Sequence, residues 1–259
     1  MNLPALHAGM LERIVAAIPG DDRIEALLAG GSMVHGGFDE QSDLDLLVVA
    51  HADAHAALLA DSRVFAAQFG ELLTAFTGQH VGEPRLLICL YGPPLLHVDL
   101  KFITPDDLDE LFERPVVVWA RHGEAITNRV ARAKVQPAQT RDAQWYEERI
   151  WLWLHYAATK LLRGELFEAV SSLDFIRLMV LGPMLQRNAG VRQRDVRRLE
   201  EDVPQAHEKL VPTMPPYNDA AIAEALRRSA ALYVELRQAD PPPSPIAGMP
   251  GLLLEYIGR

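Results

Sequence analysis

Three aspartates stand where their carboxylates could hold a divalent metal ion. Asp43 and Asp45 lie two residues apart in the run DLDLLVVA, and Asp99 lies in a later run, LLHVDLKFI. Because side chains two apart on a strand point to the same face, we expect the carboxylates of Asp43 and Asp45 to lie together. His97, Asp99 and Lys101 alternate with apolar residues, so Asp99 is also predicted on the polar face of a half-buried sheet.

These three carboxylates would repel one another unless they were protonated or bridged by cations. Hard cations such as Mg²⁺ resolve the conflict, because they prefer oxygen ligands and combine a few carboxylates with the phosphates of a substrate. We therefore predict Asp43, Asp45 and Asp99 as metal ligands and as catalytic residues. An isolated Asp-x-Asp pair would more often be solvated on an edge strand, but the third aspartate and the turn described next favour the metal site.

A glycine turn precedes the first two aspartates. Gly30 and Gly31 close an apolar strand, and Ser32 could cap a helix or bond a phosphate oxygen. Glycine lets the backbone approach a ligand closely, and unpaired N–H groups at the start of the next turn suit an anion such as a triphosphate. Taken alone, such a turn is most often an ordinary loop. Together with the aspartates it predicts a site that holds a nucleoside triphosphate through a divalent metal.

The elements around these residues read as an α/β unit with a mixed sheet of about five strands. The sequence pattern predicts helices at 6–18, 51–69 and 106–113, strands at 23–29, 85–91, 95–103 and 115–120, and a further strand carrying Asp43 and Asp45. Residues 71–77 are predicted to extend or repeat the second helix, and Gly92-Pro93-Pro94 forms a turn between strands. This half supplies the carboxylates and the glycine turn.

From about Thr140 the strand signals disappear and helical patterns take over. They cover residues 142–163, 165–187, 194–209 and 219–238, and the apolar tail 252–257 is expected to dock back as a short segment. The polar stretch between Arg121 and Thr140 is predicted to be the connection. The predicted fold class is therefore α+β, with a sheet domain at 1–135 and an all-α helical bundle domain at 136–259.

The motif set resembles the nucleotidyltransferase superfamily with the polymerase-β-type fold. In that family an apolar strand, Gly-Ser, a spacer of roughly ten residues and Asp-x-Asp precede a third acidic residue in a later strand. Here these are Gly31-Ser32, residues 33–42, Asp43, Asp45 and Asp99, and the resemblance covers about the first 120 residues. It implies that the turn holds the β- and γ-phosphates of ATP or another nucleoside triphosphate, and that the aspartates bind two Mg²⁺ ions.

The helical half is similar to that of the small-molecule antibiotic nucleotidyltransferases, such as the kanamycin and streptomycin adenylyltransferases. The stretch ERIWLWLHYAATKLLRGELFEA shares with the streptomycin branch the spacing of Tyr156, Arg163 and Glu165. The resemblance implies a helical acceptor-binding domain and an aminoglycoside-like acceptor.

One predicted helix carries a stripe of basic and aromatic side chains at three- and four-residue steps. Its members are Arg149, Trp153, Tyr156, Lys160 and Arg163. Lys160 or Arg163 is predicted to steady the triphosphate, with pairing to Glu165 or other acids as the alternative. On the same helix, Glu147 or Glu148 could take the proton of an acceptor hydroxyl, a role also open to Asp99, although an ordinary helix-surface role is the more common one.

The composition limits the kinds of partner that this chain is expected to bind. The net charge of −10 disfavours a nucleic-acid partner and weakly favours a cationic small molecule. Hydrophobic residues make up 49% of the chain, which fits a globular protein, and no run reaches the length of a membrane span. A single cysteine, Cys89, excludes an internal disulfide and is expected in the core. With no signal-peptide pattern, a cytoplasmic location is expected.

The sequence therefore predicts a metal-dependent enzyme that moves a nucleoside monophosphate, AMP from ATP in the first instance, onto a hydroxyl of a small acceptor. Pyrophosphate would be released. One alternative is transfer to a protein or to an RNA end, and the acidic balance weighs against RNA. A second is a nucleotide-binding sensor without catalysis. The three acidic positions argue against the sensor, because a chain with no catalytic need for them could lose one and relieve their repulsion.

Overall fold

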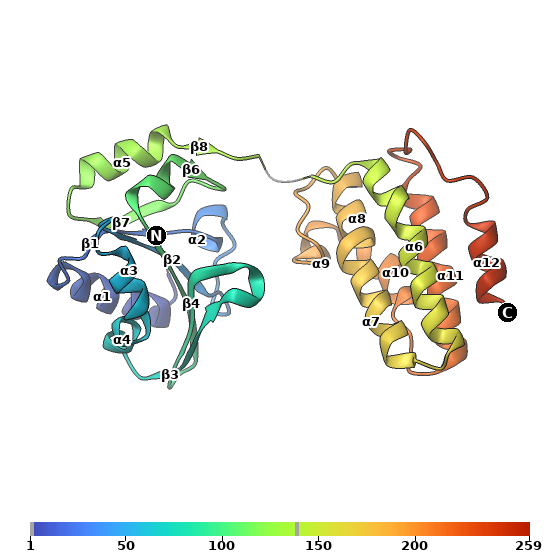
Figure 1. Ribbon diagram of the computed structural model, residues 1–259, viewed down its shortest axis with the longest axis horizontal. Helices are drawn as coiled ribbons and strands as arrows, with labels where there is room; N and C mark the ends of the chain where they lie inside the picture. Colours follow the sequence, from blue (N-terminus) through green and yellow to red (C-terminus); the bar gives the residue numbers. More distant parts are fainter. Residues whose placement is uncertain (1–2, 138–139) are drawn as a thin grey trace. The chain divides into compact units, whose positions relative to one another are not determined.

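The computed structural model describes residues 3–137 and 140–259. The chain divides into two compact units, residues 1–138 and 139–259 (Figure 1). The first unit contains strands and helices, and the second contains helices, so the predicted α+β fold is confirmed. Within the described residues, no helix combines the length and the apolar character that crossing a membrane requires.

The first unit is built on a six-stranded mixed sheet with the order β3-β4-β5-β2-β1-β7. Its strands are β1 (Ile24–Ala29), β2 (Leu44–Ala50), β3 (Leu72–Gly78), β4 (Glu83–Tyr91), β5 (Leu96–Ile103) and β7 (Val116–Ala120). Neighbours pair antiparallel except for β2 and β5, which pair parallel. Two short strands, β6 (Glu110–Leu111) and β8 (Lys134–Val135), form a separate parallel pair.

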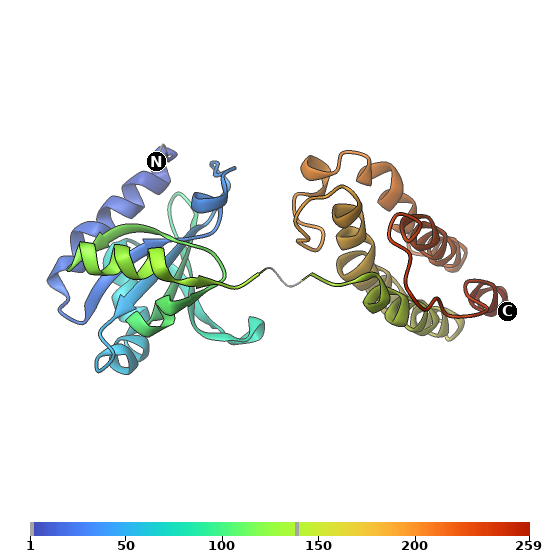
Figure 2. The same cartoon turned by 90° about the horizontal axis from the view of Figure 1, so that it is seen from above.

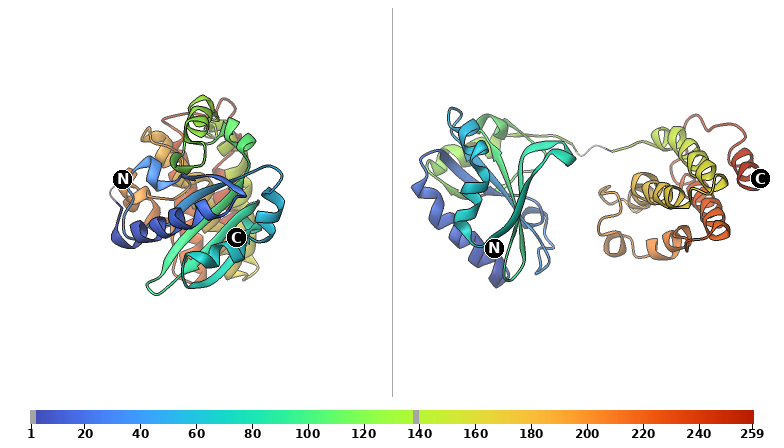
Figure 3. Two further views of the ribbon diagram at one scale, coloured as in Figure 1. Left: turned by 90° about the vertical axis from the view of Figure 1, so that its left-hand side faces the viewer. Right: turned by 60° about the horizontal axis from the view of Figure 1, so that its bottom comes forward.

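Helices cover both faces of this sheet (Figures 1 and 3). On one face, α1 (Ala5–Ala17), α3 (His55–Ala60) and α4 (Ser62–Ala66) bury apolar side chains against strands β1, β2, β4 and β5. On the other face, α5 (Gly123–Arg132) packs through Ile126 and Val130 on the region around β1. Strand β1 is buried along its whole length because it lies between these two layers.

The strand alternation predicted around the aspartates is confirmed. In β2, Leu44 and Leu46 are buried while Asp45 is half-buried, and in β5 Val98 and Leu100 are buried around Asp99. The apolar rows belong to the core under α1, α3 and α4, so the carboxylates lie on the opposite face of the sheet.

The prediction that residues 71–77 extend a helix is wrong. They form β3, an edge strand that pairs antiparallel with β4 and places Phe76 opposite Ile88. The segment contains Thr74, Phe76 and Thr77, residue types that suit a pleated, half-buried surface. Pairing with β4 satisfies its backbone hydrogen-bonding groups. The site is unaffected, because β3 lies at the far edge of the sheet from β2.

Two other local predictions need correction. The stretch between Arg121 and Thr140, predicted as an irregular connection, contains α5 and β8. Helix α5 is short and mostly polar, and its buried stripe consists of only Ile126 and Val130, four residues apart on one face. The helix predicted at 106–113 is only a 3₁₀ helix, η4 (Pro105–Asp109), and the chain then enters β6.

The regular elements described in the second unit are all helices (Figure 2). Its elements are α6 (Ala143–Leu162), α7 (Leu166–Ile176), the π-helical η5 (Arg177–Leu181), α8 (Gly182–Asn188), α9 (Leu199–Asp202), α10 (Ala206–Leu210), the 3₁₀ helix η6 (Val211–Thr213), α11 (Asp219–Leu236) and α12 (Gly251–Ile257). The tail docks as predicted, since Leu253 and Ile257 are buried in this core. The single helix expected at 194–209 is instead the two short helices α9 and α10.

Candidate functional site

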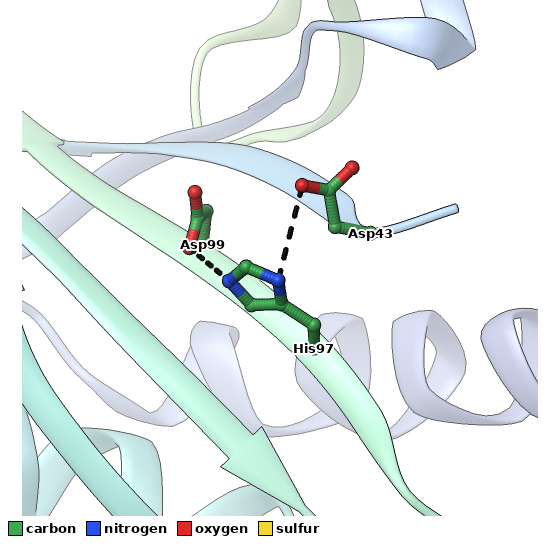
Figure 4. Close-up of side chains that lie close together, drawn as sticks. All are labelled: Asp43, His97 and Asp99. Carbon is green, nitrogen blue, oxygen red and sulfur yellow. Dashed lines mark hydrogen bonds and ion pairs between the residues drawn. The ribbon is translucent and has the colours of Figure 1, made fainter. Parts of the chain in front are cut away.

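The parallel pairing of β2 with β5 brings the predicted carboxylates together. Asp45 lies directly opposite Asp99, and Leu44 lies opposite Val98. Asp43 and His97 precede this last pair, so they lie one row further along the same face. Four polar side chains thus form two neighbouring rows, one of two aspartates and one of an aspartate and a histidine. Figure 4 shows three of them, Asp43, His97 and Asp99.

His97 lies between two of the carboxylates. Its Nε2–H donates to Oδ1 of Asp99 at 2.8 Å, and its Nδ1 lies 3.9 Å from Oδ2 of Asp43 (Figure 4). The hydrogen bond to Asp99 raises the pKa of His97 above its usual value, against the effect of burial, and the charges of Asp43 and Asp45 act in the same direction. The neighbouring carboxylates therefore favour the protonated form of His97.

Sequence reasoning placed His97 on the polar face but did not assign it to the site. The signal was its position two residues before Asp99 on the same strand, which forces both side chains to one face. Atoms from Asp43, His97 and Asp99, one from each, all lie within 4.8 Å of one another. These three residues together could hold a metal ion.

The glycine turn packs directly on Asp45. Gly31 adopts a φ of +58°, which favours glycine, and a Cβ built on it would lie 1.8 Å from Oδ2 of Asp45. The N–H of Gly30 donates to the carbonyl oxygen of Asp45 at 2.9 Å. No side chain can therefore stand at position 31 without displacing the Asp45 carboxylate, and the turn and the aspartates form one continuous surface.

Ser32 is the first residue of the short helix α2 (Ser32–His35), and Gly31 occupies the N-cap position. The expectation that Ser32 caps the helix is therefore wrong: its side chain makes no capping bond, because the glycine conformation has moved the helix start back by one residue. The Ser32 hydroxyl oxygen is buried and has no hydrogen-bond partner among the described residues. A buried hydroxyl without a partner is costly, which suggests that something absent from the structure bonds to it.

Glu113 forms a hydrogen bond with the backbone amide of the glycine turn. Its Oε1 accepts a hydrogen bond from the N–H of Gly31 at 2.6 Å, and its Oε2 contacts Nε2 of His35. Sequence reasoning did not find this residue, because it lies 82 positions from Gly31 along the chain. The carboxylate of Glu113 thus sits where a phosphate oxygen is predicted to bind.

A pocket of about 490 Å³ opens beside the turn and the aspartates. Its charged lining consists of Asp45, Glu83, Arg85, Asp99, Lys101, Asp107, Glu110 and Glu113. Within it, Lys101 Nζ lies 2.7 Å from Glu83, and Arg85 contacts both Glu83 and Asp107. Burial raises the pKa of Glu83, but hydrogen bonds from Arg85 and Lys101 outweigh it and lower this pKa to about 2. The pocket is therefore acidic at neutral pH, and its two cations are already paired.

The remaining predicted nucleotide contacts, Lys160 and Arg163, belong to the second unit. Lys160 Nζ lies 2.8 Å from Glu165 and 3.1 Å from Glu168, and Arg163 lies 3.9 Å from Glu165. This is the local pairing that the sequence analysis gave as the alternative. A contact of Lys160 or Arg163 with the triphosphate stays a prediction.

The two glutamates considered as a base have different environments. Glu148 is exposed and lies 3.3 Å from Arg149, as a helix-surface residue would. Glu147 is fully buried, so a helix-surface role is wrong for it. Its carboxylate accepts hydrogen bonds from Tyr233 and Arg237, on or next to α11. Burial raises the pKa of Glu147, but these hydrogen bonds outweigh it and keep the pKa below its usual value.

Cys89 lies in the core, as predicted. It is fully buried in β4, and burial raises the pKa of its thiol to about 12. A thiol with such a pKa is protonated at neutral pH and is a poor nucleophile.

Comparisons with known proteins give matches only at the level of structure. No family model and no curated protein matches the sequence. The chain is similar to an aminoglycoside 6-adenyltransferase from Bacillus subtilis, with 13% identity and a TM-score of 0.43 over 96% of this chain and 97% of that one. It is also similar to a nucleotidyltransferase-like protein from Exiguobacterium sibiricum, with 12% identity and a TM-score of 0.36 over 89% and 75% of the two chains. At TM-scores below 0.5, the chemistry of this chain has to be argued from its own side chains.

Proposed function

We propose that this chain is a nucleotidyltransferase that moves a nucleoside monophosphate, AMP from ATP in the first instance, onto a hydroxyl of a small acceptor. The observation that supports it most is the juxtaposition of the glycine turn with the aspartates. Gly31 has no room for a side chain because the carboxylate of Asp45 fills that space, and Asp45 is paired in register with Asp99. The glycine turn, whose backbone could bind phosphate, thus lies next to the carboxylates that could bind metal, on one face of the sheet.

The residues present fit a metal-bound triphosphate. The donor set of Asp43, Asp45 and Asp99 offers the oxygen atoms that divalent cations prefer. The buried Ser32 hydroxyl without a partner is available to donate to a phosphate oxygen. We infer that Gly30, Gly31 and Ser32 hold the β- and γ-phosphates and that the three aspartates hold two divalent ions, with Mg²⁺ the ion expected for oxygen ligands.

The proposed reaction is an in-line displacement at the α-phosphorus. The acceptor oxygen forms a bond to this phosphorus, the bond to the bridging oxygen breaks, and pyrophosphate leaves with that oxygen. Bound metal would stabilise the charge on the phosphates and lower the pKa of the acceptor hydroxyl. Asp99 is the residue of the first unit proposed to accept the hydroxyl proton, because its carboxylate lies on the site face in register with Asp45.

The proposed acceptor is a small cationic compound such as an aminoglycoside. The charged residues that line the pocket are six acids and two bases, and both bases are paired with acids of the same pocket. The excess of acids over bases would attract an ammonium group, whereas an anionic acceptor would be repelled. We further propose that the helical unit binds the acceptor and that the protein works in the cytoplasm.

The test is pyrophosphate release from labelled ATP in the presence of a panel of aminoglycosides and lincosamides. Asp45→Asn is expected to lower turnover at least about a thousandfold, because removing one ligand charge disrupts metal binding and the positioning of the phosphate. Asp53→Asn, an exposed aspartate in the turn after β2, is the control and should keep wild-type turnover. Near-normal turnover of Asp45→Asn would show that the metal assignment is wrong.

A panel on which no compound reacts would count against the small acceptor and move the proposal toward a protein target. Binding of an ATP analogue that ignores divalent metal would instead favour a nucleotide sensor. These two results are separated by calorimetry on the wild-type protein with and without Mg²⁺.

A further inference from the structure

The row that contains His97 differs chemically from its neighbour. Asp45 and Asp99 face each other as two oxygen donors, whereas Asp43 shares its row with an imidazole. Both rows lie on one face of the same two strands. If the site holds two ions, the two positions are therefore not equivalent.

The contacts of His97 fit a metal ligand. Its Nε2–H donates to Asp99, which orients the ring and leaves Nδ1 facing Asp43. Histidines that bind metals commonly donate the other ring N–H to a carboxylate in this way. The arrangement therefore resembles a carboxylate that holds a histidine in position for an ion.

The separation of Nδ1 from the carboxylate of Asp43 points to the same conclusion. At 3.9 Å it is too long for a hydrogen bond. Metal–ligand bonds of about 2.0–2.2 Å place two ligands on one ion about 3–4 Å apart. The gap between Nδ1 of His97 and Oδ2 of Asp43 has this width.

The three side chains are accessible enough for an ion to reach them. The exposed fractions of the side chains are 45% for His97, 36% for Asp43 and 17% for Asp99. His97 lies within β5, and Asp43 directly precedes Leu44, the first residue of β2 in the register.

We propose that His97 is a nitrogen ligand and that its Nδ1, together with Asp43, binds a first-row transition dication, such as Mn²⁺, in preference to Mg²⁺, while Asp99 orients the imidazole. Imidazole nitrogen is a good ligand for transition metals, whereas Mg²⁺ binds almost only through oxygen. The inference rests on the proposed function for the use of the bound ion, but binding itself needs no transfer reaction. It implies one mixed nitrogen and oxygen position beside an all-oxygen position.

The probe is Mn²⁺ alone, added to the full chain freed of metal. Pulsed electron paramagnetic resonance of bound Mn²⁺ should show coupling to a ¹⁴N nucleus in the wild type, and His97→Gln should abolish it. The same substitution should weaken Mn²⁺ binding about tenfold or more, while the affinity for competing Mg²⁺ changes less than about twofold. The matched control is His80→Gln, an exposed histidine in the 3₁₀ helix η3 (Gln79–Val81), which should keep both the coupling and the affinity.

Bound Mn²⁺ without nitrogen coupling in the wild type would overturn the inference, as would equal affinities of wild type and His97→Gln. Circular dichroism of His97→Gln establishes that the variant is folded, and the wild-type spectrum tests the ligand without any variant. Failure of this inference is distinct from failure of the proposed function. If His97→Gln still catalyses nucleotidyl transfer with Mg²⁺ alone, the proposed function remains supported. If bound Mn²⁺ shows nitrogen coupling but no acceptor is modified, only the metal site is supported.

Discussion

At the scale of single residues, Glu113 shows what a phosphate would have to replace. Its carboxylate accepts a hydrogen bond from the Gly31 amide, and a Cβ built on Gly30 would lie 3.1 Å from Oε1 of Glu113. The glycine turn therefore already holds an anion that belongs to the protein. A triphosphate that binds this turn must displace the carboxylate of Glu113. The negative charge of that carboxylate repels the triphosphate as long as the carboxylate stays nearby.

Glu113→Gln is therefore expected to strengthen nucleotide binding about tenfold, which corresponds to about 1.4 kcal/mol. The neutral amide oxygen holds the Gly31 N–H more weakly than the carboxylate does, and it adds no charge repulsion. Calorimetry with a non-hydrolysable ATP analogue and a divalent metal measures the effect.

The matched control for this prediction is Glu110→Gln. Glu110 also lines the pocket, but no hydrogen bond joins it to the glycine turn among the described contacts. Its replacement should change the dissociation constant less than about twofold, as expected for an exposed charge. Unchanged or weaker nucleotide binding by Glu113→Gln would show that Glu113 assists the nucleotide rather than competing with it.

At the scale of elements, strand pairing in the first unit and a buried carboxylate in the second unit hold neighbouring elements together. In the first unit, parallel pairing of β2 with β5 aligns the metal-binding rows. In the second unit, the buried carboxylate of Glu147 joins α6 to α11. It accepts hydrogen bonds from Trp151, Tyr233 and Arg237, and from the backbone N–H of Ile246 in the segment that follows α11.

Glu147→Gln is expected to lower the free energy of unfolding of the second unit by about 3 kcal/mol. The loss has this size because the substitution leaves the guanidinium of Arg237 without its charged partner, and that side chain is only 20% exposed. Denaturant unfolding followed by tryptophan fluorescence measures it, since Trp151 bonds to the same carboxylate.

Glu148→Gln is the neighbouring control. Glu148 pairs with Arg149 at the surface with 54% of its side chain exposed, so its replacement should cost less than about 1 kcal/mol. Equal losses from the two substitutions would mean that the buried carboxylate contributes no more to stability than a surface ion pair.

At the scale of the whole molecule, the net charge of −10 bears on the acceptor. Lysine and arginine number 25 against 35 aspartates and glutamates, and the candidate pocket shares this acidic balance. A negative field around the protein attracts cationic compounds over distances that salt shortens to about 10 Å at 0.1 M.

The KM for a cationic acceptor is therefore expected to rise several-fold between about 0.02 and about 0.5 M salt, because screening weakens this attraction. Steady-state kinetics at fixed Mg²⁺ and saturating ATP measure it. A neutral hydroxyl compound from the same panel serves as the control, since its KM should not respond. A cationic acceptor whose KM is independent of salt would show that the acidic lining does not recognise its charge.

The sequence by itself determined the local pattern of this protein. Alternation along two strands placed Asp43, Asp45 and Asp99 on polar faces, and helical periodicity identified most of the second unit, because both depend only on the repeat of the backbone. Strand β3 and helix α5 escaped this reasoning, since the pairing of β3 with β4 and the packing of α5 on the sheet are long-range contacts.

Only the tertiary structure decided which side chains meet. The partners of β2 come from different parts of the chain, and sequence spacing gives neither the strand order nor the register that sets Asp45 opposite Asp99 and His97 beside Asp43. The contact of Glu113 with Gly31 across 82 positions depends on the same folding. The carboxylates could be read from the chain, whereas the histidine among them and the carboxylate on the glycine turn follow from long-range packing.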